Sequence, residues 1–230
     1  MPVIHVIYED DHFLAIEKPY GLAVHKVSPT DPQETLADIL VRKRPYLAEV
    51  GENPLRPGIV HRLDKETSGI MLIAKDQATF EYLKNLFQTR QVKKEYFALV
   101  YGNPKQDTDT IDAALGKIGT KQTTQIRGKR ELVVRDAVTD YEVLRRYRDY
   151  ALVRVMPRTG RTHQIRVHMK HIGHPLTGDK LYASKKPLPP GLERLFLHAH
   201  RLSLTGPDGT ALDLESPLPP DLQKTLDMLE

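Results

Sequence analysis

Residues 58–75 read GIVHRLDKETSGIMLIAK, and this stretch decides how the first half of the chain folds. Apolar runs lie at both ends of it, Ile59-Val60 and Ile70 to Ala74, and their composition is typical of buried strands. Between the runs, HRLDKETSG places one carboxylate, Asp64, beside an arginine and a histidine in a segment that ends in small turn-forming residues. A turn held between buried strands presents its side chains rigidly, as functional loops often do.

The residues alone allow three interpretations of Asp64. It can cap a turn through the amides of Thr67 and Ser68 with Arg62 as its ion-pair partner, a structural role that Asp often has. It can bind a metal ion together with His61, although the later histidines do not have the i, i+4 spacing of a zinc helix. It can also be a catalytic carboxylate, which needs a cation to keep it ionised and a pocket that excludes water.

Hydrophobic patterning on both sides of this stretch indicates an α+β protein. Apolar alternation predicts strands at residues 3–8, 13–17, 70–74, 94–101, 137–144, 150–156 and 196–204. Helical spacing predicts helices at residues 35–42, 76–89 and 163–172 and a terminal helix from residue 219, with loops at 45–58 and 116–130, the second of them flexible. We therefore expect one domain over residues 1–230, with a mixed, mainly antiparallel β-sheet flanked by helices and loops.

Composition excludes several classes of protein. The chain has no Cys, so it has neither a disulfide framework nor a thiolate zinc site. No apolar run resembles a signal peptide or reaches the length of a membrane span, so we expect a cytoplasmic protein. Residues 117–170 contain 14 Lys or Arg against 5 Asp or Glu, which fits either a surface for a polyanion or a face of solvated salt bridges.

A second polar stretch, Arg161 to Arg166, supplies candidate cations. Arg166 lies between Ile165 and Val167 on a predicted half-buried helix. A buried arginine needs a partner, and a carboxylate in a cleft would supply one.

Four stretches, in this order, resemble the signatures of the RluA-type pseudouridine synthases: GIVHRLDKETSGIMLIAK, KKEYFALVYG, RTGRTHQIRVHMKHIGHPLTGDKLY and FLHAHRLSL. The resemblance implies a single catalytic domain with a pseudouridine synthase-like fold and a central active-site cleft. It implies an isomerase that converts uridine to pseudouridine in ribosomal RNA, transfer RNA or both. This reaction adds and removes no atoms overall, so no cofactor and no metal are expected. The alternatives are a non-catalytic RNA-binding or assembly factor and a metal-dependent hydrolase.

The resemblance also assigns roles to individual residues. Asp64 matches the catalytic aspartate, Tyr96 the tyrosine that stacks on the target base, and Arg166 the basic residue that pairs with the aspartate. Arg62 matches the arginine associated with holding the base out of the helix. Further contacts to RNA or to the pocket are expected from the remaining matched residues: His61, Thr67, Arg161, His163, Gln164 and Leu197.

Larger relatives carry an N-terminal S4 RNA-binding domain, whereas strand patterning here begins at Val3. We therefore expect the catalytic domain to recognise RNA by itself, with the segment from Lys121 to Arg135 wrapping a stem-loop. No apolar surface stripe is left over, so a monomer is expected.

Overall fold

The apolar run after the Asp64 turn forms β3 (Ser68–Ala74), in which every residue is buried. The computed structural model describes residues 2–119, 121–124 and 133–230. By its internal contacts the chain divides into two compact units: unit 1 (Met1–Lys93 and Ala199–Pro217) and unit 2 (Lys94–His198 and Leu218–Glu230). The expectation of one domain over residues 1–230 stays a prediction.

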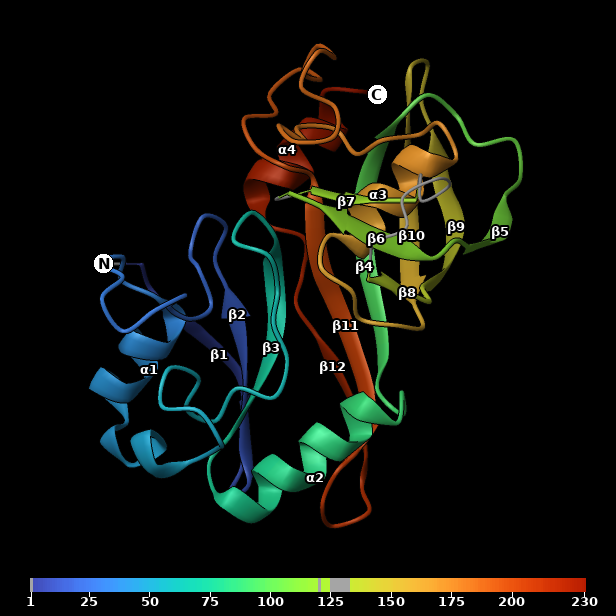
Figure 1. Ribbon diagram of the computed structural model, residues 1–230. Coiled ribbons are helices and arrows are strands. Elements are labelled where there is room, and N and C mark those ends of the chain that lie inside the picture. The colour runs from blue at the N-terminus through green and yellow to red at the C-terminus, as the bar shows by residue number, and fades with distance from the viewer. Residues whose placement is uncertain (1, 120, 125–132) are drawn as a thin grey trace. The chain divides into compact units, whose positions relative to one another are not determined.

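Unit 1 is built on strands in the order β1-β2-β3-β11, with β12 beside β11. Its remaining elements are β1 (His5–Glu9), β2 (Phe13–Lys18), α1 (Leu36–Lys43), a 3₁₀ helix (Pro45–Glu49), α2 (Gln77–Gln88), most of β11 (Leu197–Thr205) and β12 (Ala211–Glu215). Strands β2 and β3 are antiparallel, and their register places Lys18 opposite Gly69. Helix α2 packs against β3 (Figure 1). The register therefore brings the end of β2 next to the end of the Asp64 turn.

Unit 2 contains strands in the order β4-β10-β9-β5 and a separate sheet in the order β7-β6-β8. Its elements are β4 (Lys93–Tyr101), β5 (Thr108–Asp112), β6 (Leu115–Ile118), β7 (Lys121–Thr123), β8 (Val134–Arg135), β9 (Val138–Arg146), β10 (Tyr150–Pro157), α3 (Gln164–His171) and α4 (Pro220–Asp227). Helix α3 packs on β9 and β10, and β7 also contacts α3 (Figure 1). The buried face of α3 thereby closes over a core that includes Ile165, Met169 and Val153.

Local sequence signals explain where the helices begin and end. Asp76 caps α2 by accepting a hydrogen bond from the amide of Thr79 at 2.8 Å. Gly173 follows α3 with φ +89, the left-handed conformation expected of a glycine at this position. The α+β class and the mainly antiparallel pairing are confirmed.

Two predicted loops are partly wrong. Within residues 45–58, Pro45–Glu49 forms a 3₁₀ helix, and Leu47 in this helix is fully buried. The first part of the predicted loop is therefore a helix packed on the core. Within residues 116–130, β6 and β7 pair in an antiparallel hairpin. Residues 120 and 125–130 of that predicted flexible segment, and residues 125–132 of the segment expected to wrap RNA, lie outside the described residues. Within the described ranges, no helix is long and apolar enough to cross a membrane.

Candidate active site

Asp64 lies at the start of a tight turn in unit 1 that leads into β3. The amide of Thr67 donates to the main-chain carbonyl of Asp64 at 3.0 Å, so the backbone itself closes the turn. The carbonyl of Lys65 accepts a hydrogen bond from the amide of Gly21 at 2.9 Å. Asp64 is half-buried. The carboxylate is therefore carried on an anchored backbone and keeps partial access to solvent.

The side chain of Lys18 ties this turn to the end of β2. Lys18 is fully buried, and its Nζ donates to the carbonyls of Pro19 at 2.8 Å, Leu22 at 2.9 Å and Lys65 at 3.3 Å. A buried ammonium group needs such partners to offset its lost hydration. Lys18 directly follows the strand predicted at residues 13–17, and the sequence gives no sign of its burial, because lysine is almost never fully buried.

Replacing Lys18 with methionine is expected to lower the free energy of unfolding by about 2–4 kcal/mol, because buried carbonyls lose their donor. Urea denaturation followed by circular dichroism measures this change. Lys84→Met, which removes a partly exposed lysine that pairs with Glu52 in the same unit, is the matched control and is expected to cost less than about 1 kcal/mol. Equal losses in the two variants would contradict an anchoring role for Lys18.

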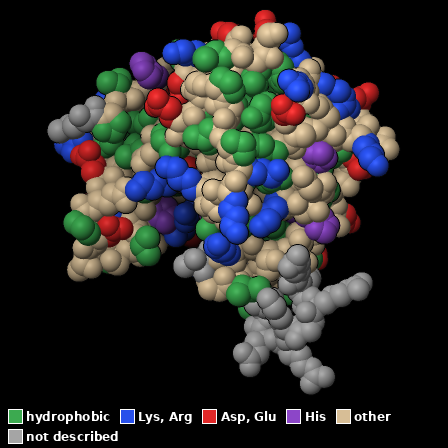
Figure 2. Space-filling view, turned by 90° about the horizontal axis from the view of Figure 1, so that it is seen from above, with side chains coloured by type: hydrophobic (Ala, Val, Ile, Leu, Met, Phe, Trp, Pro, Cys, Tyr) green, Lys and Arg blue, Asp and Glu red, His purple; other side chains and the backbone are tan. Residues whose placement is uncertain are grey.

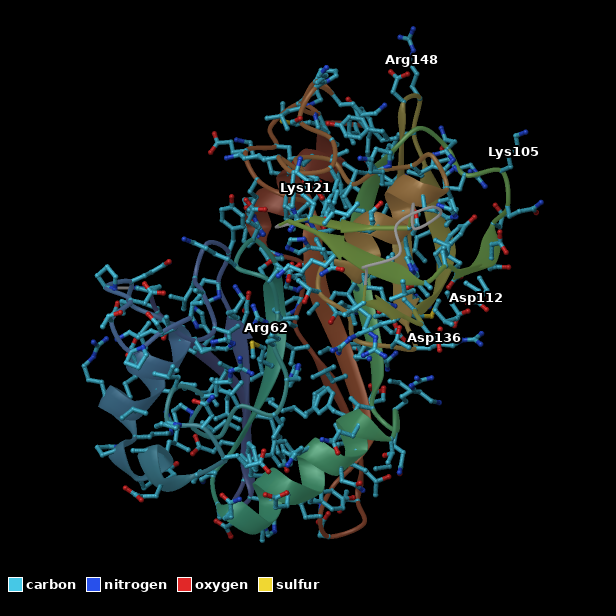
Figure 3. All side chains as sticks on the ribbon, viewed as in Figure 1. Arg62, Lys105, Asp112, Lys121, Asp136 and Arg148 are labelled. Carbon is cyan, nitrogen blue, oxygen red and sulfur yellow. The ribbon has the colours of Figure 1, made fainter. Side chains whose placement is uncertain are left out.

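Arg62 is exposed and is oriented by His25 (Figure 3 labels Arg62 on the segment before β3). Its Nη1 donates to Nε2 of His25 at 3.1 Å, and Nδ1 of the same ring lies 2.8 Å from the carbonyl of Lys26. A carbonyl only accepts, so Nδ1 carries the proton and Nε2 is the acceptor. Burial lowers the pKa of His25, and the positive charges of Arg56 and Arg62 lower it further. The hydrogen bond to the carbonyl of Lys26 acts in the opposite direction but is outweighed. A neutral His25 therefore positions Arg62. Among the described residues Arg62 does not form the salt bridge to Asp64 that the structural interpretation of Asp64 includes beside the cap.

His61 and Thr67 lie inside unit 1. Nε2 of His61 accepts a hydrogen bond from the amide of Leu72 at 2.9 Å, and its ring stacks on Phe87 of α2 with centroids 4.3 Å apart. Thr67 is 2% exposed. These contacts fit residues that hold the turn against β3 and α2 better than residues that meet RNA directly.

In unit 2, the structure brings Tyr96 and Leu197 into one hydrophobic cluster. Tyr96 lies on β4 opposite Val155 of β10 and packs, partly buried, against a core that contains Leu197 and Ile165. Leu197 itself is 3% exposed. The tyrosine ring is thus supported by an apolar wall while part of it stays accessible.

Arg166 is 3% exposed and forms a two-point ion pair with Asp179. Its Nε donates to Oδ2 and its Nη2 to Oδ1, both at 2.8 Å. Sequence reasoning predicts that this arginine needs a carboxylate but does not identify Asp179, although Asp179 lies within the third stretch that carries the family resemblance. An ion pair of Arg166 with Asp64 would join one residue of each unit and, like the central cleft, stays a prediction.

The turn before α3 is fixed by Gln164 and His163. Gln164 is 4% exposed; its Oε1 accepts from Thr159 Oγ1 and Arg161 N, and its Nε2 donates to Val138 O and Thr139 Oγ1. Both acceptor positions of Oε1 and both N–H groups of Nε2 are therefore occupied by partners within unit 2.

His163, at the helix start, has φ 56, and its Nδ1 lies 2.9 Å from the hydroxyl of Tyr182. Arg161 is half-buried, with Nε donating to the carbonyl of Asp136 at 3.2 Å. Among the described residues, no group of three or more His, Asp or Glu is arranged to hold a metal ion.

Comparison with known proteins identifies the class to which these residues belong. Residues 12–171 match the family described as RNA pseudouridylate synthase. An uncharacterized RNA pseudouridine synthase of Synechocystis is 38% identical over 229 residues, covering 97% of this chain and 68% of the relative. The ribosomal large subunit pseudouridine synthase D of Pseudomonas aeruginosa is 39% identical, covering 98% of this chain and 72% of the relative.

The solved structure of human RNA pseudouridylate synthase domain containing 4 superimposes with a TM-score of 0.78 at 30% identity, covering 97% of this chain and 92% of that one. The chain belongs to the RNA pseudouridylate synthase family. It is an RNA pseudouridine synthase, an isomerase, and the resemblance seen in the four sequence stretches is confirmed.

Proposed function

We propose that this enzyme isomerises specific uridines of ribosomal or transfer RNA, with Asp64 as the catalytic carboxylate. The observation that carries the proposal is the similarity, along nearly the whole chain, to a relative named for the large ribosomal subunit. The same match favours an enzyme over a binding factor built on the same fold. The cytoplasmic location and monomeric state expected from the sequence stay predictions.

The chemistry suits the proposed residues. The bond between N1 of uracil and C1′ of the sugar breaks, C5 bonds to C1′, the proton on C5 leaves, and N1 takes up a proton. Asp64 would act as the nucleophile or the base of this exchange. The target base must leave its stack. Arg62, which is exposed, is suited to filling the vacated space, and Tyr96, whose ring packs against apolar side chains, is suited to stacking on the base. The positive charge of Arg166 would favour the ionised form of the catalytic carboxylate.

Exposed lysines around Tyr182 in unit 2 support RNA as the partner. We call Lys117, Lys121, Lys170 and Lys180 the lysine face; all four are exposed. Two members of the set lie near Tyr182. Lys170 Nζ is 5.7 Å from its ring centroid, and Lys121 precedes Gln122, whose amide donates to the Tyr182 hydroxyl at 3.0 Å.

In the part of the chain that the structure describes, none of these lysines has a carboxylate partner. Figure 3 labels Lys121 on β7, and Figure 2 shows that Lys and Arg are common among the charged side chains of the face drawn there. Unpaired surface lysines are suited to phosphate contacts.

Replacing Lys121 and Lys170 together with glutamine is expected to weaken RNA binding at low salt. It is also expected to reduce the slope of log K against log salt by about 1 for each lysine, because each phosphate contact releases counterions. Filter binding over a range of about 50 to 300 mM salt gives both numbers. Lys84→Gln, whose lysine pairs with Glu52 in unit 1, is the control and is expected to keep the wild-type slope. An unchanged slope in the double variant would remove the lysine face from the proposed RNA surface.

Release of tritium tests the reaction itself. Ribosomal and transfer RNA labelled at C5 of uracil lose tritium to water when C5 becomes bonded to the sugar. Purified protein is expected to release tritium in proportion to the pseudouridine found after digestion. Absence of release from both RNA classes, with RNA binding intact, would contradict the proposed substrates.

A further inference from the structure

Asp179 accepts four hydrogen bonds in the buried part of unit 2. Oδ1 accepts from Arg166 Nη2 and from the amides of Leu181 and Tyr182, at 2.8, 2.9 and 2.9 Å, while Oδ2 accepts from Arg166 Nε at 2.8 Å. Asp179 is 2% exposed. Its carboxylate is therefore fixed by the amides of its own turn as well as by the guanidinium that it binds.

The turn that carries Asp179 is itself rigid. Gly178 has φ +73, and a Cβ there would lie 2.1 Å from the carbonyl oxygen of Arg194, so only glycine fits. On the other side, the ring of Tyr182 lies 5.3 Å from Cζ of Arg166. The hydroxyl of Tyr182 is also within 2.9 Å of Nδ1 of His163 at the start of α3. The guanidinium is thus held in its plane by Asp179 and flanked by an anchored aromatic ring.

Stability alone does not account for this arrangement. A buried ion pair repays its desolvation only with good geometry, and apolar residues of similar volume often replace such pairs without loss of stability. Burial opposes ionisation of Asp179, but the hydrogen bonds and charge of Arg166 and the amides of Tyr182 and Leu181 outweigh it, so the pKa of this carboxyl lies below its usual range. What the pair does provide is direction, because two parallel bonds fix the guanidinium plane and hence the directions in which its other N–H groups point.

We propose that Asp179 is a positioning residue that orients Arg166 for the isomerisation. This inference rests on the proposed function, in which Arg166 acts at the catalytic carboxylate. Asp179 would act through Arg166 and would not itself touch the RNA. Its loss is therefore expected to change the rate of the chemical step and to leave RNA affinity unchanged.

The test is a double-mutant cycle of Asp179→Asn and Arg166→Lys, measured as single-turnover tritium release at saturating RNA. Asn keeps the size of Asp but places an amide where two-point acceptance is needed, and Lys keeps the charge of Arg166 but cannot form the two-point pair. The matched control is Asp221→Asn, since Asp221 forms a similar two-point pair with the buried Arg194 in the same unit. Thermal unfolding and RNA affinity are measured for every variant.

Asp179→Asn is expected to slow the chemical step about 30-fold or more, with RNA affinity within about threefold of wild type. In the Arg166→Lys background the same change is expected to cost less than about threefold, because residues that act as a unit are not additive. Asp221→Asn is expected to lower the melting temperature without slowing the folded enzyme.

A single-turnover rate for Asp179→Asn equal to that of the wild type would overturn the inference. So would an equal fold-loss of rate from this substitution in the wild-type and Arg166→Lys backgrounds, or a fall in rate that is fully explained by a smaller folded fraction. Failure of the wild-type protein to release tritium would instead contradict the proposed function.

Discussion

Replacing Asp64 with asparagine is expected to lower the rate of pseudouridine formation by more than about 10³-fold while RNA binding is retained. Asparagine has nearly the same shape as aspartate but is neither a nucleophile nor a base. The turn is closed by the main-chain carbonyl of Asp64, so the substitution leaves that hydrogen bond in place. Tritium release from labelled RNA measures the rate, and filter binding measures affinity.

Glu66→Gln is the matched control, because it removes a second half-buried carboxylate from the same turn. We expect it to keep the rate within about threefold of wild type, as substitutions outside critical sites usually do. A parallel loss of folding or RNA affinity in Asp64→Asn would indicate a structural role for Asp64 instead.

Replacing Gly69 with alanine is expected to destabilise the protein by about 3–5 kcal/mol or to prevent folding. Gly69 ends the Asp64 turn with φ +119, and a Cβ there would lie 2.2 Å from the carbonyl oxygen of Ala199 on β11. Both the backbone conformation and the close approach exclude a side chain, and a shift of either strand would disturb the turn. Urea denaturation measures the loss of stability.

Gly209→Ala separates the two causes. Gly209 lies in the same unit with φ +84, but a Cβ at this position would have no heavy atom within 4 Å apart from those of its two chain neighbours. This variant is expected to lose only the conformational part, about 1 kcal/mol. Equal losses at the two positions would show that the close approach of β11 adds nothing.

The elements that sequence patterning predicts well are those whose apolar residues are nearly continuous or whose ends carry strong signals. Strand β3 is buried along its whole length, and α2 has a capping aspartate in Asp76. Patterning misses β5 and β12, which expose most of their residues and therefore show little apolar alternation. The hairpin of β6 and β7 is missed because its strands are short and polar, with four residues in β6 and three in β7.

The candidate site shows the same limit at the level of single residues. Asp64, Tyr96 and Arg166 are found from the sequence because each lies in a stretch that resembles a family signature. The residues that hold site residues in place, His25, Lys18 and Asp179, act through tertiary contacts distant in the chain. Hydrogen bonds such as that between Lys18 and Lys65 leave no periodic trace in a sequence.

The most direct test of the central claim maps pseudouridine by chemical modification in total RNA from cells that lack this protein. The cells are complemented with the wild-type chain, with Asp64→Asn, or with neither. We expect at least one uridine of ribosomal or transfer RNA to be modified with the wild-type chain and unmodified in the other two strains. A map that is identical in all three strains, or that Asp64→Asn restores, would contradict the claim that Asp64 is the catalytic carboxylate of an RNA-modifying site.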